Sequence, residues 1–211
     1  MGATRLLVHP VAKPALFVVC LLPLAFVLSG VLLDRVGPNP SEYLIRSSGI
    51  WALRFLCLAL AVTPLRVLAG RPAIARFRRM FGLFAFVYVV LHALSYAWFD
   101  MGFIAGDILT DIGRRPFILV GVTAFMLLIP LAATSFNRAI RALGASRWQA
   151  LHRAVYGVAG LAILHFFWMR AGKNDHAEVM VYAAIVAALL GWRGLRSIGR
   201  NRSFPAPNRH S

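Results

Sequence analysis

Four ionisable side chains lie inside long apolar stretches of the sequence: Arg54, His92, His152 and His165. Ionisable groups at membrane depth are costly and usually functional. A single such histidine is equally well explained by a hydrogen bond between helices. Three of them, with no acidic residue in the same stretches to complete a proton relay, favour ligation of a metal or a haem iron, because neutral imidazole is a good iron ligand.

The stretches around these residues are long enough to cross a membrane. Of the 211 residues, 60% are hydrophobic and 14% charged, whereas soluble domains are roughly 45–50% apolar and about 25% charged. Apolar runs recur along the chain, and a run of about 20 residues spans a hydrocarbon core of ~30 Å as a helix. The sequence therefore predicts an all-α integral membrane protein, a bundle of six transmembrane helices. The predicted spans are residues 14–33, 50–65, 80–99, 116–136, 148–169 and 179–192.

Five spans is the alternative, because the last run is the shortest, but the distribution of charge favours six. The net charge is +16, from 23 Lys and Arg against 7 Asp and Glu. With six spans, most cations fall on one side and all seven acids on the other, so the positive-inside rule places both termini in the cytoplasm. This segregation also argues against nucleic acid as a partner. Attraction to anionic lipid headgroups explains the basic face. The same face is also compatible with docking of an acidic soluble partner.

The rise of 1.5 Å per residue gives each histidine a depth below the basic side of the predicted bundle. His92 lies about 20 Å and His165 about 27 Å below the basic side, so these two can bind one iron from opposite sides. His152 lies only about 8 Å below the basic side and would serve a second site. On an ideal helix the rings of His152 and His165 point apart, and Gly157 and Gly160 between them would ease a distortion or the approach of a flat porphyrin.

Arg54 is expected about 8 Å below the outer surface, near the level of His92 and His165. There it would neutralise a haem propionate, or else extend to the outer headgroups or a loop acid.

Several short motifs occur in the order seen in a known family. These motifs are 37–40 (GPNP), 42–46 (EYLIR), 51–55 (WALRF), 63–66 (TPLR), 78–82 (RRMFG) with His92, 115–118 (RPFI), 151–153 (LHR) and 164–166 (LHF). With them the chain resembles, from about Val8 to Trp192, the MsrQ (YedZ) family of haem-binding membrane subunits. That family belongs to the wider group of ferric-reductase-like transmembrane domains.

The resemblance implies a b-type cytochrome of six helices in the bacterial inner membrane, with haem b held between spans three and five. It would take electrons from a cytoplasmic flavin reductase or the quinol pool and pass them to a periplasmic molybdopterin-containing methionine sulfoxide reductase subunit. The chain would then be the electron-transfer subunit, not the catalytic one. The relatives' fused flavin and nicotinamide domain is absent here, and a bound FMN is compatible with the family but has no motif in this sequence.

The family's haem histidines correspond to His92, His152 and His165, and the resemblance allows one haem or two. Arg78 and Arg79 stand where relatives with two haems carry a second histidine on span three. This difference leaves the inner haem without an evident second ligand, and the two arginines would instead hold its propionates.

The sequence predicts one membrane domain. Residues 1–13 are interpreted as a cytoplasmic segment, residues 14–193 as the transmembrane domain and residues 194–211 as a disordered, basic cytoplasmic tail. Two other functions are compatible with the residues. One is a stand-alone transmembrane haem reductase of ferric iron or oxygen, and the other is a proton-coupled small transporter, against which the lack of acidic residues inside the spans argues.

Overall fold

The computed structural model describes residues 7–172 and 175–202, and for 198–202 only the backbone. Six segments of this part of the chain are long and apolar enough to cross a membrane, which confirms the predicted count. They are α2 (Ala12–Leu32), α3 (Pro40–Leu68), the segment Pro72–Asp100, α6 (Pro116–Ala133), the segment Ala145–Ala171 and α10 (Ala177–Arg202).

Two of the six segments are composite. The third joins a 3-10 helix, η1 (Pro72–Phe77), to α4 (Arg78–Ser95) and a π-helix, η2 (Tyr96–Asp100). The fifth consists of α8 (Ala145–His152) and α9 (Ala154–Ala171). A π-helical turn inside an otherwise α-helical segment often marks a functional site.

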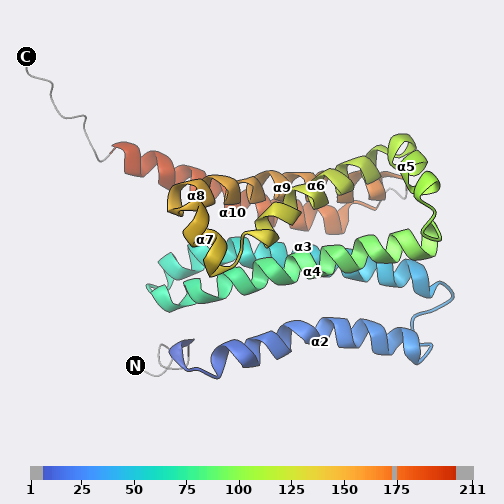
Figure 1. Cartoon of the computed structure of the whole chain (residues 1–211), viewed down its shortest axis with the longest axis horizontal. Helices are drawn as coiled ribbons and strands as arrows, with labels where there is room; N and C mark the ends of the chain where they lie inside the picture. Colours follow the sequence, from blue (N-terminus) through green and yellow to red (C-terminus); the bar gives the residue numbers. More distant parts are fainter. Residues whose placement is uncertain (1–6, 173–174, 203–211) are drawn as a thin grey trace, which may run out of the picture.

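The spans run back and forth along one axis. Helix α2 begins and α10 ends at the same end of the bundle, and the short helix α5 (Ala105–Arg114) lies at the other (Figure 1). All seven acidic residues belong to the connections and helix ends on the α5 side, here called the acidic end; the opposite end, with α7 (Asn137–Leu143), is called the basic end. The charge segregation read from the sequence is therefore a property of the folded chain.

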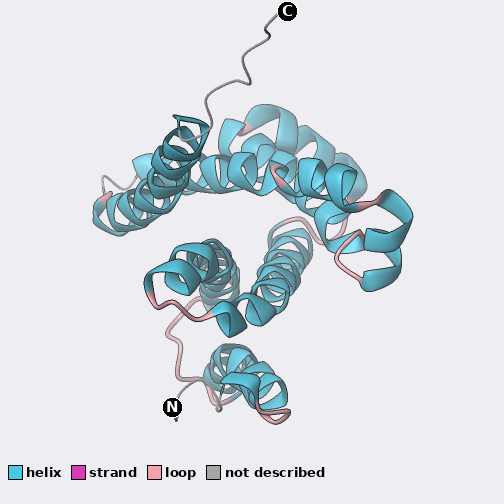
Figure 2. Ribbon diagram, turned by 90° about the vertical axis from the view of Figure 1, so that its left-hand side faces the viewer, coloured by secondary structure: helices cyan, strands magenta, loops and turns pink. Residues whose placement is uncertain are grey.

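The closest packing is between α3 and α4 and between α6 and α9. Viewed nearly along the helix axes, α2 lies on the far side of the α3–α4 pair from the layer that contains α6, α9 and α10 (Figure 2). A buried cluster of aromatic rings joins α3 to α4 and both to α2. The Phe55 ring of α3 stacks on Phe84 and contacts Tyr88, both of α4, and the Tyr88 hydroxyl donates to the Cys20 carbonyl of α2 at 3.2 Å. These contacts fix α3 and α4, which form one wall of the site.

Helix α3 is longer than the predicted span 50–65, because residues 40–49, a mixture of polar and apolar side chains, are also helical. The Asn39 side chain caps the helix by accepting from the Glu42 N–H at 3.1 Å, and Pro40 occupies the first turn. The Ser48 hydroxyl is satisfied inside the helix, since it donates to the Leu44 carbonyl at 2.7 Å. Arg54 therefore lies about 21 Å from the start of the helix, near the middle of α3. Its predicted depth of about 8 Å below the outer surface stays a prediction, because the helix extends beyond the predicted span at both ends.

The last span also extends further than predicted. Helix α10 begins at Ala177 and continues to Arg202, so the segment from 194 to Arg202 is helical rather than the disordered tail that the sequence suggested. The rest of that predicted tail, 203–211, lies outside the described residues, as do residues 1–6 of the predicted N-terminal segment.

Candidate functional site

Two of the three histidines singled out in the sequence face each other across the bundle. His92 projects from the last turn of α4 and His165 from the second half of α9. Their ring centroids are 6.1 Å apart and their planes are nearly perpendicular, at 83°. The structure thus brings together the pair that the depth argument selected.

A backbone carbonyl fixes the orientation of each ring. His92 Nδ1 lies 2.8 Å from the Ile45 carbonyl oxygen of α3, and His165 Nδ1 lies 2.6 Å from the Phe117 carbonyl oxygen of α6. A carbonyl oxygen only accepts, so Nδ1 of each ring carries the proton and donates. The lone pair of each imidazole is therefore on Nε2, which is the arrangement found in metal-ligating histidines.

Both rings line a cavity of about 510 Å³ between α3, α4, α6 and α9. This volume falls in the range of small-molecule and cofactor sites, about 300–1,000 Å³. The cavity is apolar along its middle and polar where it opens at the acidic end. Its apolar walls include Ile50, Leu53, Leu56, Val89, Ile118, Val122, Phe125, Leu128, Val158, Ala162 and Phe166.

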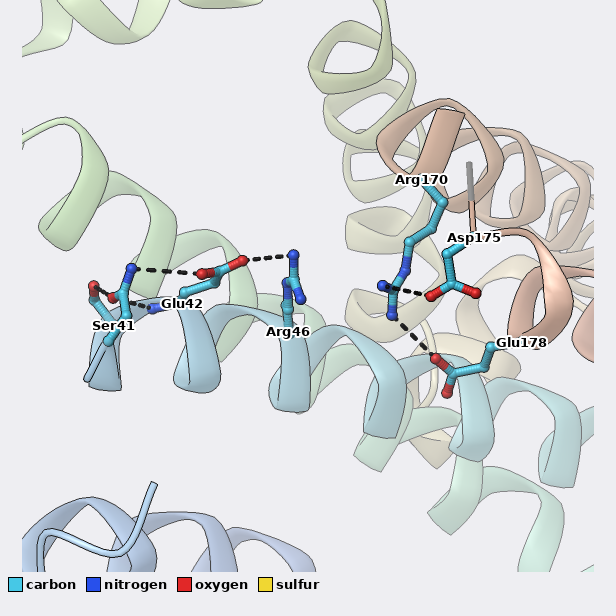
Figure 3. A network of polar contacts seen from close by, with 7 residues as sticks. Ser41, Glu42, Arg46, Arg170, Asp175 and Glu178 are labelled. Carbon is cyan, nitrogen blue, oxygen red and sulfur yellow. Dashed lines mark hydrogen bonds and ion pairs between the residues drawn. The ribbon is translucent and has the colours of Figure 1, made fainter. Parts of the chain in front are cut away.

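Arginines and carboxylates line the polar opening. Figure 3 shows the ion pairs that two of these arginines form. Arg46 forms an ion pair with Glu42, one turn away on α3. Arg170, at the end of α9, contacts Asp175 at 3.2 Å and Glu178 at 3.3 Å. The Arg170 side chain is only 15% exposed, and its Nε is buried without a hydrogen-bond partner. An orphaned, charged donor on a cavity wall is a place where an anionic group of a ligand would be stabilised.

A third arginine at the opening, Arg115, pairs with Asp111 of α5, and Asp111 also accepts from the Tyr96 hydroxyl of the π-helix. The Arg115 guanidinium holds the pKa of the Asp111 carboxyl below its usual value, because its hydrogen bonds favour the charged form. This pair ties α5 to the start of α6 and to the end of the helical segment that bears His92.

We expect the contribution of the Asp111–Arg115 pair to the stability of the folded protein to be independent of pH except under strongly acidic conditions. A carboxyl whose pKa is lowered in the folded state stabilises the fold at every pH above its pKa in the unfolded state, about 3.9. This stabilisation is lost as the pH falls through the pKa of the folded state. The thermal midpoint of the wild type should therefore exceed that of Asp111→Asn by a constant amount from about pH 8 to about pH 5, and the two should converge only below about pH 4. A difference that vanishes by pH 6 would contradict this assignment.

The residues of the cavity fit a haem. Transition metals lie roughly 2 Å from an imidazole nitrogen, so two rings that ligate one ion from opposite sides have centroids roughly 6 Å apart. Within the described ranges, no group of three or more His, Cys, Asp or Glu side chains could hold a metal ion. Two imidazoles alone therefore require a ligand that brings its own equatorial donors, and a porphyrin does so. The apolar slot suits its ring and the arginines suit its carboxylates.

His152 lies elsewhere. Its Nε2 is 3.1 Å from the Thr134 hydroxyl, and its ring stacks on Trp148 with centroids 4.0 Å apart. It is not among the described residues that line the cavity. The structure therefore accounts for this imidazole by local contacts at the basic end, and a second haem there stays a prediction.

The predicted arginines are also outside the cavity lining. Arg54 Nε donates to the Tyr182 hydroxyl at 2.8 Å, and its guanidinium lies over the Trp51 ring at 4.5 Å. These contacts engage the guanidinium with Tyr182 and Trp51 inside the bundle, and the pairing of Arg54 with a propionate stays a prediction. Arg46, Arg115 and Arg170 occupy the corresponding place.

The arginine pair at the start of α4 is engaged at the basic end. Arg78 donates to the Thr63 hydroxyl and Arg79 to the Asn137 side chain, each at 2.8 Å. Both contacts lie far along the helix from His92, as expected for a separate site, and neither arginine reaches the described cavity.

Comparison with known proteins agrees with the site. The family described as "ferric reductase like transmembrane component" matches residues 48–164. The chain is 65% identical over 192 residues to a protein-methionine-sulfoxide reductase heme-binding subunit MsrQ of Polaromonas naphthalenivorans, covering 91% of this chain and 88% of that one. Proteins of the same name from Bordetella pertussis (53% identical; 86% and 87% covered) and Rhodospirillum rubrum (45%; 92% and 92%) are also similar. No solved structure matches.

Proposed function

Since this chain belongs to the MsrQ family of haem-binding subunits and contains a ferric-reductase-like transmembrane component, we propose that it is a b-type cytochrome that carries electrons across the bacterial inner membrane. The observation that carries this function is the pair His92 and His165, with Nε2 of both rings left free on opposite sides of one apolar cavity. When bound there, the haem would supply reversible one-electron transfer at its iron.

The residues of the chain then have separate tasks. His92 and His165 would hold the iron from two sides, and the Ile45 and Phe117 carbonyls keep their Nε2 lone pairs available. The apolar walls would keep water away from the iron, which would favour electron transfer over chemistry with solvent. Arg170, with its orphaned Nε, would pair with a propionate at the opening, where Arg46 and Arg115 also lie.

The charge distribution supports an orientation of the chain in the membrane, and so the side on which each partner would bind. By the positive-inside rule the basic end faces the cytoplasm and the acidic end the periplasm. His165 is six residues from the end of α9, so the haem would lie about 9 Å from the acidic end of that helix. A group held by His165 would therefore be close to the periplasmic face.

The relatives are named as subunits of a protein-methionine-sulfoxide reductase. The acceptor in our account is accordingly a periplasmic molybdopterin-containing methionine sulfoxide reductase subunit, and the donor is a cytoplasmic flavin reductase or the quinol pool. A bound FMN is not part of this function, because the described cavity lining contains no feature specific to a flavin.

Electron transfer across a bilayer tests the function directly. The full chain, loaded with haem, would be placed in liposomes with ferricyanide trapped inside, and a flavin reductase with NADH and FMN would supply electrons outside. We expect the trapped ferricyanide to be reduced much faster with the wild type than with His165→Ala. Equal rates for the two proteins would contradict the proposal.

His152→Ala provides a second test of the assignment. Its ring contacts Thr134 and Trp148, not the cavity, so the variant should keep the low-spin haem spectrum of the His92–His165 centre. If a second haem binds at the basic end, only that component should be lost. Loss of all haem in this variant would show that His152 is a ligand of the main site and would overturn the pairing.

A further inference from the structure

The two imidazoles rest against neighbouring helices in the same way. His92 lies against α3, where the Ile45 carbonyl accepts from its Nδ1 and Gly49 follows one turn later. His165 lies against α6, where the Phe117 carbonyl accepts from its Nδ1 and Gly121 follows one turn later. In both cases carbonyl and glycine are four residues apart, so they share one face of their helix.

The glycines are necessary for this approach. A Cβ on Gly121 would lie 2.7 Å from His165 Nδ1 and 2.8 Å from its Cε1. A Cβ on Gly49 would lie 3.0 Å and 3.1 Å from the same atoms of His92. An alanine at position 121 would thus push the His165 ring away from the carbonyl oxygen to which it donates, and an alanine at position 49 would require the His92 ring to move by a few tenths of an ångström.

Other glycines on the histidine-bearing helices do not have this role. A Cβ built on Gly82 of α4, or on Gly157 or Gly160 of α9, meets no atom within 4 Å outside its own helix. Gly157 and Gly160 therefore make no close contact with an imidazole, and their predicted role in easing a helix distortion or the approach of a porphyrin stays a prediction.

We propose that Gly49 and Gly121 are positioning residues of the haem site: each makes room for an imidazole to donate from Nδ1 to the neighbouring helix, and so sets the plane and the electron-donating strength of that ligand. This inference rests on the proposed function. A hydrogen bond from Nδ1 raises the basicity of Nε2 and stabilises the oxidised iron, which lowers the reduction potential. The same two hydrogen bonds hold the ring planes at 83°.

Gly121→Ala and Gly49→Ala test the proposal in the full-length, haem-loaded protein. Weakening the hydrogen bond should shift the haem reduction potential upward and change the electron paramagnetic resonance signal, which reports the angle between the ligand planes. The effect should be larger for Gly121→Ala, because its Cβ contacts are the shorter ones. Gly82→Ala and Gly160→Ala are matched controls on α4 and α9 and should leave both readouts unchanged.

The outcomes separate this inference from the proposed function. A colourless wild type overturns both. If the wild type binds haem but Gly49→Ala and Gly121→Ala leave the potential and the resonance signal unchanged, the inference alone is overturned. It is also overturned if the two controls show an equal shift. Haem loss in the Gly variants, with wild-type helical content by circular dichroism and haem retained in the controls, supports it. If Gly121→Ala fails to fold, Gly49→Ala tests the inference instead, because its Cβ contacts are longer.

Discussion

Replacement of His165 by alanine will abolish the low-spin haem of this protein, and replacement of His92 will do the same. Each ring supplies one of the two Nε2 atoms that face the cavity, and no other described histidine, cysteine or acid forms a group with them that could replace the lost ligand. Loss of a group that only supports a ligand costs about 10- to 100-fold in metal affinity, so loss of the ligand itself should cost more.

The measurement is the absorption spectrum and the haem-to-protein ratio of each purified variant. His176→Ala is a suitable control, because that imidazole is also near the acidic end but stacks on Phe167, with centroids 5.1 Å apart, outside the cavity lining. It should keep the wild-type haem content. An intact low-spin spectrum in both His92→Ala and His165→Ala would show that the iron is held elsewhere.

Arg170→Gln should weaken haem binding roughly 10- to 100-fold, because a hydrogen bond to a charged group contributes about 1.5–3 kcal/mol. The change removes the orphaned Nε donor at the cavity opening. It also breaks the ion pairs with Asp175 and Glu178, but those carboxylates are 55% and 39% exposed, so their loss should cost little stability.

A modified ligand distinguishes propionate binding from a general structural effect. Haem with esterified propionates has no negative charge for Arg170 to pair with, so it should bind to the wild type and to Arg170→Gln with similar affinity. Arg114→Gln, at an exposed arginine of α5, is the control and should bind both haems as the wild type does. A loss of affinity in Arg170→Gln that is equal for both haems would refute the propionate assignment.

The sequence was sufficient for those features that depend on one helix at a time. Six apolar runs predicted six spans because crossing a bilayer requires each helix to satisfy its own backbone hydrogen bonds. The level shared by His92 and His165 followed from the regular rise of a helix, and the structure brings the two rings together.

The features that were missed depend on contacts between helices or on capping. The predicted start of helix α3 was too late because residues 41–48 include two charged residues and three serines. The Asn39 side chain nevertheless caps a helix that includes them, and the Ser48 hydroxyl is satisfied by the Leu44 carbonyl within it. The role of Arg54 depends on Tyr182, 128 residues away along the chain, which no local pattern indicates. Gly49 and Gly121 look like any other glycine until α4 and α9 are packed against α3 and α6.

The most direct test of the central claim, a haem held between His92 and His165, is a reduced-minus-oxidised absorption spectrum of the purified full-length protein after expression with ample haem. The account predicts a b-type, six-coordinate, low-spin spectrum with at least one haem per chain. A colourless protein, or a five-coordinate high-spin spectrum, would contradict it.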